Sequence, residues 1–166
     1  MPLTTAYLGL GSNVGARFEQ MCAALRHLQA AGLAIINTSP VYQNRAVGMG
    51  TADPFLNAVV EVRTTLQAEG LLNLCLAIET QLGRIRTQRW SPRTIDIDIL
   101  IFGHTQIHTE RLQLPHPGIT ERDFVLQPLL DIAPELKLQG ASIKILWQQL
   151  ASVKLERVSQ SLSECL

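Results

Sequence analysis

Residues 84–99 read Arg84-Ile-Arg-Thr-Gln-Arg-Trp-Ser-Pro-Arg93-Thr-Ile-Asp96-Ile-Asp98-Ile99. Four arginines and a tryptophan precede two aspartates that are two residues apart. From residue 95 to 101, isoleucine occupies every second position, and the aspartates stand between the first three of them. Alternation with a period of two predicts a half-buried strand whose side chains leave opposite faces in turn. We therefore predict a strand over residues 95–102 with both carboxylates on one face.

The two aspartates and the arginines before them are typical of a site for a metal and a phosphate. Two carboxylates side by side repel each other unless a cation lies between them. Mg²⁺ takes oxygen ligands and keeps phosphate oxygens in the rest of its coordination shell, and arginine presents a planar fork of donors to phosphate. The alternative is a solvated strand face, but Asp is depleted in strands and like charges on one face are unfavourable. We predict a metal-dependent nucleoside triphosphate site.

Length and charge restrict the class of protein. The chain has 166 residues, a formal net charge of zero and 17% charged residues. Such a length predicts a single domain, residues 1–166, with a sizeable core. A protein that binds nucleic acid in general carries a basic excess, which this chain lacks. Clustered arginines in a neutral chain favour a small anionic ligand.

The cysteines and the apolar segments predict a location. Cys22, Cys75 and Cys165 are odd in number and lack the spacing of a metal site, so we expect reduced thiols. The first residues have no basic cluster followed by an apolar run. No segment approaches ~18 uninterrupted apolar residues. We therefore expect a cytoplasmic protein that neither spans nor binds a membrane.

The periodicity of the apolar residues predicts an α+β fold. It indicates strands over 6–10, 34–42, 55–64 and 95–102, helices over 18–28 and 68–82, and two short helices near 124–131 and 143–151. The order β-α-β-β-α-β is that of a ferredoxin-like sandwich, an antiparallel sheet with helices on one face. The last two helices are additions at the C-terminal end. On the opposite face we expect Asn57, Asp96 and Asp98 on an open surface that loops can cover.

Three motifs together resemble a known enzyme family. Gly11-Ser12-Asn13, Arg93-Thr-Ile-Asp96-Ile-Asp98-Ile99, and Pro115-His116 followed by Arg122 resemble 6-hydroxymethyl-7,8-dihydropterin pyrophosphokinase of folate biosynthesis. The resemblance runs from about Tyr7 to Glu135. It implies transfer of the β,γ-diphosphate of ATP to the pterin hydroxymethyl oxygen, with release of AMP. It also implies two Mg²⁺ ions, ATP as co-substrate and a monomer whose partners are small molecules.

The resemblance assigns roles to individual residues. It implies that Asp96 and Asp98 bind the metal ions, and that the catalytic residues are Arg84, Arg93, Asp96 and Asp98. The residues that it implies for ATP are Glu79, Arg84, Arg86, Arg89, Trp90, Arg93, Ile99, Arg111, His116 and Arg122. The residues that it implies for the pterin are Asn44, Arg45, Val47, Phe55, Asn57 and Phe124.

Two other functions are compatible with parts of the sequence. A non-catalytic pterin- or nucleotide-binding domain could act as a partner subunit, but a pure binder has no need of an Asp pair for metal. A ferredoxin-like RNA-binding module is the other alternative. Low basicity and the scarcity of exposed aromatic residues on the strands oppose it. Formation of AMP from ATP separates the enzyme from both.

Overall fold

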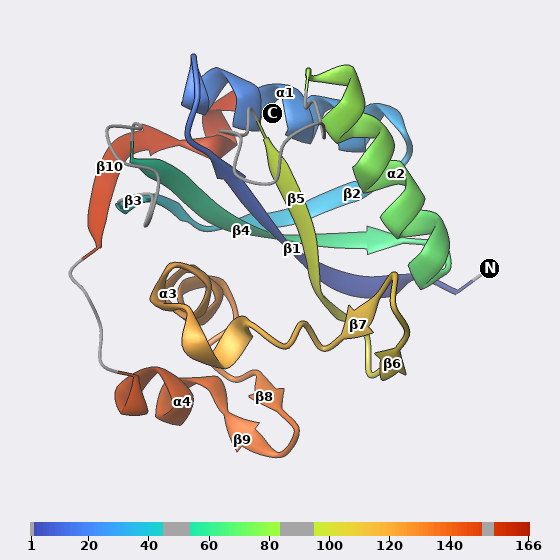
Figure 1. Cartoon of the computed structure of the whole chain (residues 1–166), viewed down its shortest axis with the longest axis vertical. Helices are drawn as coiled ribbons and strands as arrows, with labels where there is room; N and C mark the ends of the chain where they lie inside the picture. The colour runs from blue at the N-terminus through green and yellow to red at the C-terminus, as the bar shows by residue number, and fades with distance from the viewer. Residues whose placement is uncertain (1, 45–53, 84–94, 151–154) are drawn as a thin grey trace.

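A six-stranded antiparallel sheet forms the centre of the molecule (Figure 1). The computed structural model describes residues 2–44, 54–83, 95–150 and 155–166. The sheet has the order β10-β3-β4-β1-β5, and β2 also pairs with β4. Its strands are β1 (Thr4–Ser12), β2 (Ala34–Thr38), β3 (Pro40–Asn44), β4 (Phe55–Thr64), β5 (Asp96–Phe102) and β10 (Glu156–Ser161). The predicted α+β, ferredoxin-like arrangement is confirmed, with one added strand at the edge.

The two long helices cover one face of the sheet. These are α1 (Arg17–Ala30) and α2 (Ala68–Gln81). The alternation along β4 sends its even-numbered side chains into this layer, where they are buried with the apolar stripes of both helices. Each helix is followed by a glycine with positive φ, Gly32 at 99° and Gly83 at 95°, which is the usual way to end a helix.

The opposite face is also partly covered, unlike the open surface predicted from the sequence. Two further helices, α3 (Asp123–Ile132) and α4 (Ile143–Gln149), lie below the sheet in Figure 1. A second apolar cluster joins Val59 of β4 and Leu100 of β5 to the buried side of these helices. Among the described residues, this cluster covers the part of the sheet face that lies against α3 and α4.

A bulge in β5 changes the face of one predicted core residue. The register with β1 shifts between Tyr7, which pairs with Ile101, and Leu8, which pairs with Ile99. Leu100 is the extra residue of β5, and both Leu100 and Ile101 belong to the second cluster. The prediction that Ile101 shares the face of Ile99 was therefore wrong, because a bulge inserts one residue into the alternation.

The predicted strand over 34–42 is broken at Ser39 into β2 and β3. The Ser39 hydroxyl accepts a hydrogen bond from the backbone N–H of Val59 at 2.9 Å and donates one to the carbonyl oxygen of Pro40 at 2.8 Å. Smaller elements complete the fold: η1 (Ile119–Glu121), η2 (Leu162–Cys165), and two hairpins formed by β6 (Ile107–His108), β7 (Gln113–Leu114), β8 (Lys137–Leu138) and β9 (Ala141–Ser142).

The end of the chain returns to α1 and is covalently attached there. Cys165 in η2 forms a disulfide with Cys22 in α1, across 143 residues of sequence. The expectation that all three cysteines are reduced thiols was wrong. Sequence spacing could not reveal the pair, because β10, the strand that precedes η2 in the chain, was not predicted. Cys75 is free and buried.

Among the described residues, none of the helices has both the length and the apolar character needed to cross a bilayer.

Candidate active site

A row of side chains crosses the sheet on the face that α3 covers only in part. Gly11 of β1 is in register with Asp96 of β5 on one side and with Asn57 of β4 on the other. Asn57 is in turn opposite Tyr42 of β3. Residues directly opposite each other in an antiparallel pair share a face. Strand register therefore brings a carboxylate, a glycine, an amide and a phenol together in one line.

Gly9 and Gly11 place no side chains in the middle of this face. A Cβ atom on Gly11 would lie 3.0 Å from Oδ1 of Asn57, closer than an ordinary contact. A Cβ atom on Gly9, which pairs with Asp98, would meet the Leu100 side chain at 3.5 Å. The two glycines therefore leave little bulk on this face, and the face forms the floor of a pocket.

The first pocket lies above this floor and has a volume of about 300 Å³. Aromatic side chains reach it from two elements, Phe55 at the start of β4 and Phe124 in the first turn of α3. Nδ2 of Asn57 donates a hydrogen bond to Oδ1 of Asn44 in this pocket, and Asn57 is only 8% exposed. The lining also includes Asp96, Asp98, Leu100, Arg122 and Val125. Such a slot suits a flat, polar-edged ring.

The second pocket lies on the other side of β5 and has a volume of about 360 Å³. Asp98 lines both pockets. The guanidinium of Arg111 lies on the rim and donates to Oε2 of Glu69 at 2.7 Å and to Oδ1 of Asn73 at 2.6 Å. Three other residues predicted to bind ATP also line this pocket, namely Glu79, Ile99 and His116. The carboxylate of Asp98 is therefore the point at which two ligands could meet.

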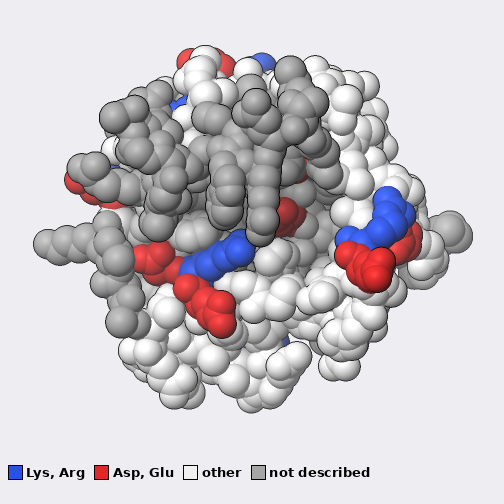
Figure 2. Space-filling model, viewed as in Figure 1, with Lys and Arg blue, Asp and Glu red and all other residues white. Residues whose placement is uncertain are grey.

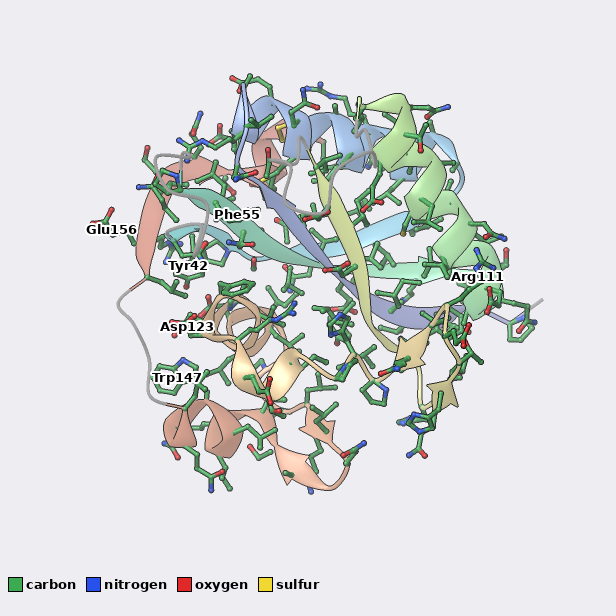
Figure 3. All side chains as sticks on the ribbon, viewed as in Figure 1. Tyr42, Phe55, Arg111, Asp123, Trp147 and Glu156 are labelled. Carbon is green, nitrogen blue, oxygen red and sulfur yellow. A yellow bond between two sulfur atoms is a disulfide. The ribbon has the colours of Figure 1, made fainter. Side chains whose placement is uncertain are left out.

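Charges of both signs surround these pockets. Figure 2 shows acidic and basic groups close together in the hollowed centre of this face, and a second group of opposite charges at its right edge. The Arg111–Glu69 ion pair lies at that edge, where Figure 3 labels Arg111. Arg122 lies with its guanidinium carbon 5.9 Å from the centre of the Phe124 ring.

His116 offers a hydrogen-bond donor at one defined nitrogen. Its Nδ1 accepts a hydrogen bond from the backbone N–H of Gly118 at 2.9 Å. Burial, and then the positive charge of Arg122, lower the pKa of His116 below its usual value. The neutral ring therefore carries its hydrogen on Nε2. A ligand oxygen is the partner that this N–H suits.

Glu79 is a buried carboxylate that fixes β5 against α2. It is 2% exposed, and its Oε2 accepts a hydrogen bond from the backbone N–H of Ile97 at 2.7 Å. Burial, and then the negative charges of Glu79 and Asp98, raise the pKa of the nearby Cys75 thiol to about 12. The thiol therefore stays protonated at neutral pH.

The donor set fits a hard divalent cation whose shell is completed by phosphates. Within the described residues, no group of three or more His, Cys, Asp or Glu side chains is placed to hold a metal ion. Asp96 and Asp98 supply carboxylate oxygens on one strand face. Mg²⁺ is commonly bound through one or two carboxylates together with substrate phosphates. The residues present therefore fit Mg²⁺ bound with a nucleotide.

The predicted site residues separate into three groups. The first pocket brings together Asn44, Phe55, Asn57, Asp96, Asp98, Arg122 and Phe124. The second brings together Glu79, Asp98, Ile99, Arg111 and His116. Outside the described residues lie Arg45, Val47, Arg84, Arg86, Arg89, Trp90 and Arg93.

The resemblance implied that Arg122 binds ATP, but the structure places Arg122 in the lining of the first pocket. A Cβ atom on Gly118 would be 2.9 Å from Arg122 and 3.2 Å from His116, so the arginine lies close to the histidine of the second pocket. Sequence reasoning missed Tyr42. Its position in a predicted strand was a signal, but the partner of its hydroxyl group belongs to α3, far away in sequence.

Comparison with known proteins is consistent with this geometry. Residues 7–134 match the sequence model of a family described as 7,8-dihydro-6-hydroxymethylpterin-pyrophosphokinase. The 2-amino-4-hydroxy-6-hydroxymethyldihydropteridine pyrophosphokinase of Methylorubrum extorquens is 44% identical over 157 residues, which are 94% of this chain and 99% of that protein. The Bacillus subtilis protein of the same name is 40% identical, over 89% of this chain and 93% of the relative.

Solved structures share the fold at lower sequence identity. A crystallised HPPK-DHPS chain in complex with substrates superimposes with a TM-score of 0.70 at 17% identity. The match covers 89% of this chain but only 43% of that longer one. At this identity the likeness shows the fold alone.

Proposed function

This chain belongs to the 7,8-dihydro-6-hydroxymethylpterin-pyrophosphokinase family, and from that membership we propose which of its residues carry out the reaction. The reaction is the transfer of the β,γ-diphosphate of ATP to the hydroxymethyl group of 6-hydroxymethyl-7,8-dihydropterin, in folate biosynthesis. The products are AMP and the pterin diphosphate. ATP is therefore a co-substrate, and both substrates are small molecules.

The pterin occupies the first pocket. Its flat ring lies between Phe55 and Phe124, which reach the pocket from β4 and α3. Asn57 has both donor and acceptor atoms for the amide edge of the ring. The hydrogen bond to Asn44 fixes the side chain of Asn57, and Gly11 leaves room for it because a Cβ atom there would lie too close to Oδ1 of Asn57. The same placement directs the hydroxymethyl group toward β5.

ATP occupies the second pocket, with its phosphates directed toward Asp98. Arg111 and His116 supply donors there, the histidine through its Nε2–H. Arg122 lies close to His116 and reaches the transferring phosphates from the side of the pterin. The arginines at 84, 86, 89 and 93 and Trp90 lie outside the described residues. Their roles toward ATP stay a prediction from the resemblance, as do those of Arg45 and Val47 toward the pterin.

Asp96 and Asp98 would hold Mg²⁺ together with the phosphates of ATP, and we propose two ions. When bound, the metal supplies positive charge beside the transferring phosphates and so lowers the cost of bringing anionic groups together. The chain itself contributes alignment. Glu79 holds β5 through Ile97, which keeps the adjacent carboxylates in place. Holding two reactants in line is a large part of catalysis in phosphoryl transfer.

One observation supports this arrangement more than any other: Asp98 lines both pockets. A group that transfers from one ligand to another must pass a point that both can reach. We further propose that residues 1–166 act as one domain and as a monomer. In support of one domain, the two pockets share Asp98 and are built from elements that span residues 9–125.

Product identity tests the function. Purified protein with ATP, Mg²⁺ and 6-hydroxymethyl-7,8-dihydropterin should give AMP and pterin diphosphate in equal amounts. ADP as the product would mean an ordinary kinase. Binding of pterin with no nucleotide product would support the non-catalytic binding domain instead.

A further inference from the structure

The hydroxyl group of Tyr42 links the sheet to α3 beside the first pocket. Tyr42 is 8% exposed and donates a hydrogen bond to Oδ2 of Asp131, near the end of α3. The other carboxylate oxygen of Asp131 accepts a hydrogen bond from Nε2 of Gln127 at 3.1 Å. Hydrogen bonds to ionised carboxylates are among the stronger ones in proteins. The bond therefore connects two elements that each carry part of the pocket wall.

Both partners stand in a defined position relative to the pocket. Tyr42 precedes Asn44 by two residues on β3, so the two side chains leave the same face. Asp131 follows Phe124 by seven residues, which is about two turns, so these two lie on the same side of α3. Figure 3 labels Tyr42 and Phe55 on the β3–β4 side of the sheet, next to α3.

Packing alone does not account for a hydroxyl at this position, because phenylalanine would fill the same space. None of the steps in the proposed reaction uses it. Burial, and then the hydrogen bond to Asp131, raise the pKa of Tyr42 to about 12. The hydroxyl therefore keeps its proton and acts as a donor at neutral pH.

We propose that Tyr42 and Asp131 are positioning residues for the pterin, and that their hydrogen bond sets the width of the slot between Phe124 and the Phe55–Asn44 side. The inference rests on the proposed placement of the pterin in the first pocket. Neither residue touches a reacting atom. Stacking on an aromatic face depends steeply on separation, since a gap of 0.5–1 Å loses roughly a quarter to a half of the dispersion energy.

The first test replaces Tyr42 by phenylalanine, which removes only the hydroxyl. Calorimetry with a non-hydrolysable ATP analogue and Mg²⁺ present should show the pterin dissociation constant rising about tenfold, as expected for one charge-assisted hydrogen bond. KM for ATP and kcat at saturating pterin should stay within about twofold of the unaltered chain, since the bond acts on the slot alone. Tyr7→Phe is the matched control, because Tyr7 leaves the same face of the sheet from β1 and packs in the second cluster.

The second test asks whether the two residues act as a pair. Asp131→Ala should weaken pterin binding as Tyr42→Phe does, and the double variant should lose no more than either single one. Asp131→Asn, which keeps an acceptor oxygen, should recover part of the loss. Asp131 is an exposed residue, so its variants remain informative if Tyr42→Phe proves unstable.

Several results would overturn the proposal. Pterin affinity unchanged by Tyr42→Phe, additive losses in the double variant, or equal weakening of pterin and ATP would each do so. Failure of the proposed function looks different, because the unaltered chain would then bind no pterin. The Tyr42–Asp131 bond can still be measured in that case. In Tyr7→Phe, Tyr42 is the remaining tyrosine, and its absorbance titration should move to lower pH when Asp131 becomes alanine.

Discussion

Adding one methyl group at Gly11 should selectively weaken pterin binding. The Cβ atom of Gly11→Ala would stand 3.0 Å from Oδ1 of Asn57, whereas ordinary contacts begin near 3.4 Å. The amide must therefore move by about 0.4 Å, and it is not free to rotate, because its Nδ2 is bonded to Asn44. The methyl group would also occupy part of the pocket floor. The pterin thus loses its hydrogen bond to Asn57, and the new methyl group displaces the ring from the floor of the pocket.

The size of the effect follows from the hydrogen bond. Loss of a bond that leaves a buried partner unpaired costs about 1–3 kcal/mol, which corresponds to a dissociation constant raised roughly 5- to 150-fold. The melting temperature should change little, because Gly11 has no positive φ and the lower entropy of the unfolded alanine chain offsets the tight contact.

Calorimetric titration with pterin and with an ATP analogue measures both affinities. Gly9→Ala is the comparison on the same strand face, where the new methyl group meets Leu100 at an ordinary 3.5 Å. It should weaken pterin binding less than Gly11→Ala does. The reasoning is refuted if Gly11→Ala leaves pterin affinity within twofold, or if it weakens ATP binding to the same extent.

Three predictions concern stability. Cys165→Ser, or reduction of the Cys22–Cys165 disulfide, should lower the free energy of unfolding. Because the disulfide closes a loop of 143 residues, the loss of chain entropy in the unfolded state predicts a decrease of up to about 5 kcal/mol. Identical denaturation midpoints with and without reductant would contradict this. Gly70→Ala on α2 should raise the free energy of unfolding by about 0.5–1 kcal/mol, since alanine favours helix and its methyl meets Leu66 at an ordinary 3.7 Å; denaturant titration that shows a loss would count against it. Because the pKa of Tyr42 is raised to about 12, its hydroxyl contributes stability that is complete below pH 10 and is lost as the pH rises toward about 12. Tyr42→Phe should therefore lose less free energy of unfolding over that range than the unaltered chain. Parallel curves of unfolding free energy against pH would exclude the contribution.

Local pattern was sufficient to predict the two long helices and the strands β1, β4 and β5 of this fold. The period-two alternation along 55–64 and along 95–99 placed Asn57, Asp96 and Asp98 on one face, and strand register now brings Asn57 and Asp96 to either side of Gly11. Periodicity predicts which face a side chain leaves, because it depends only on neighbours in sequence. It succeeds wherever a strand is regular.

Features that depend on contacts distant in sequence could not be predicted this way. The disulfide follows β10, whose residues Glu156–Ser161 show no clear alternation of burial and, among the described strands, pair with β3 at the edge of the sheet. The bulge at Leu100 depends on a pairing with β1, and the bond between Tyr42 and Asp131 joins residues 89 positions apart. Each of these is decided by tertiary packing, which outweighs local preference.

Asp96 and Asp98 are proposed to bind Mg²⁺ where the two substrate pockets meet. The decisive experiment measures turnover of Asp96→Ala and Asp98→Ala at saturating Mg²⁺, together with the thermal unfolding of each variant. We predict that each variant nearly loses AMP formation while remaining folded, because the metal loses a carboxylate ligand. Turnover near that of the unaltered chain in both folded variants would contradict the claim.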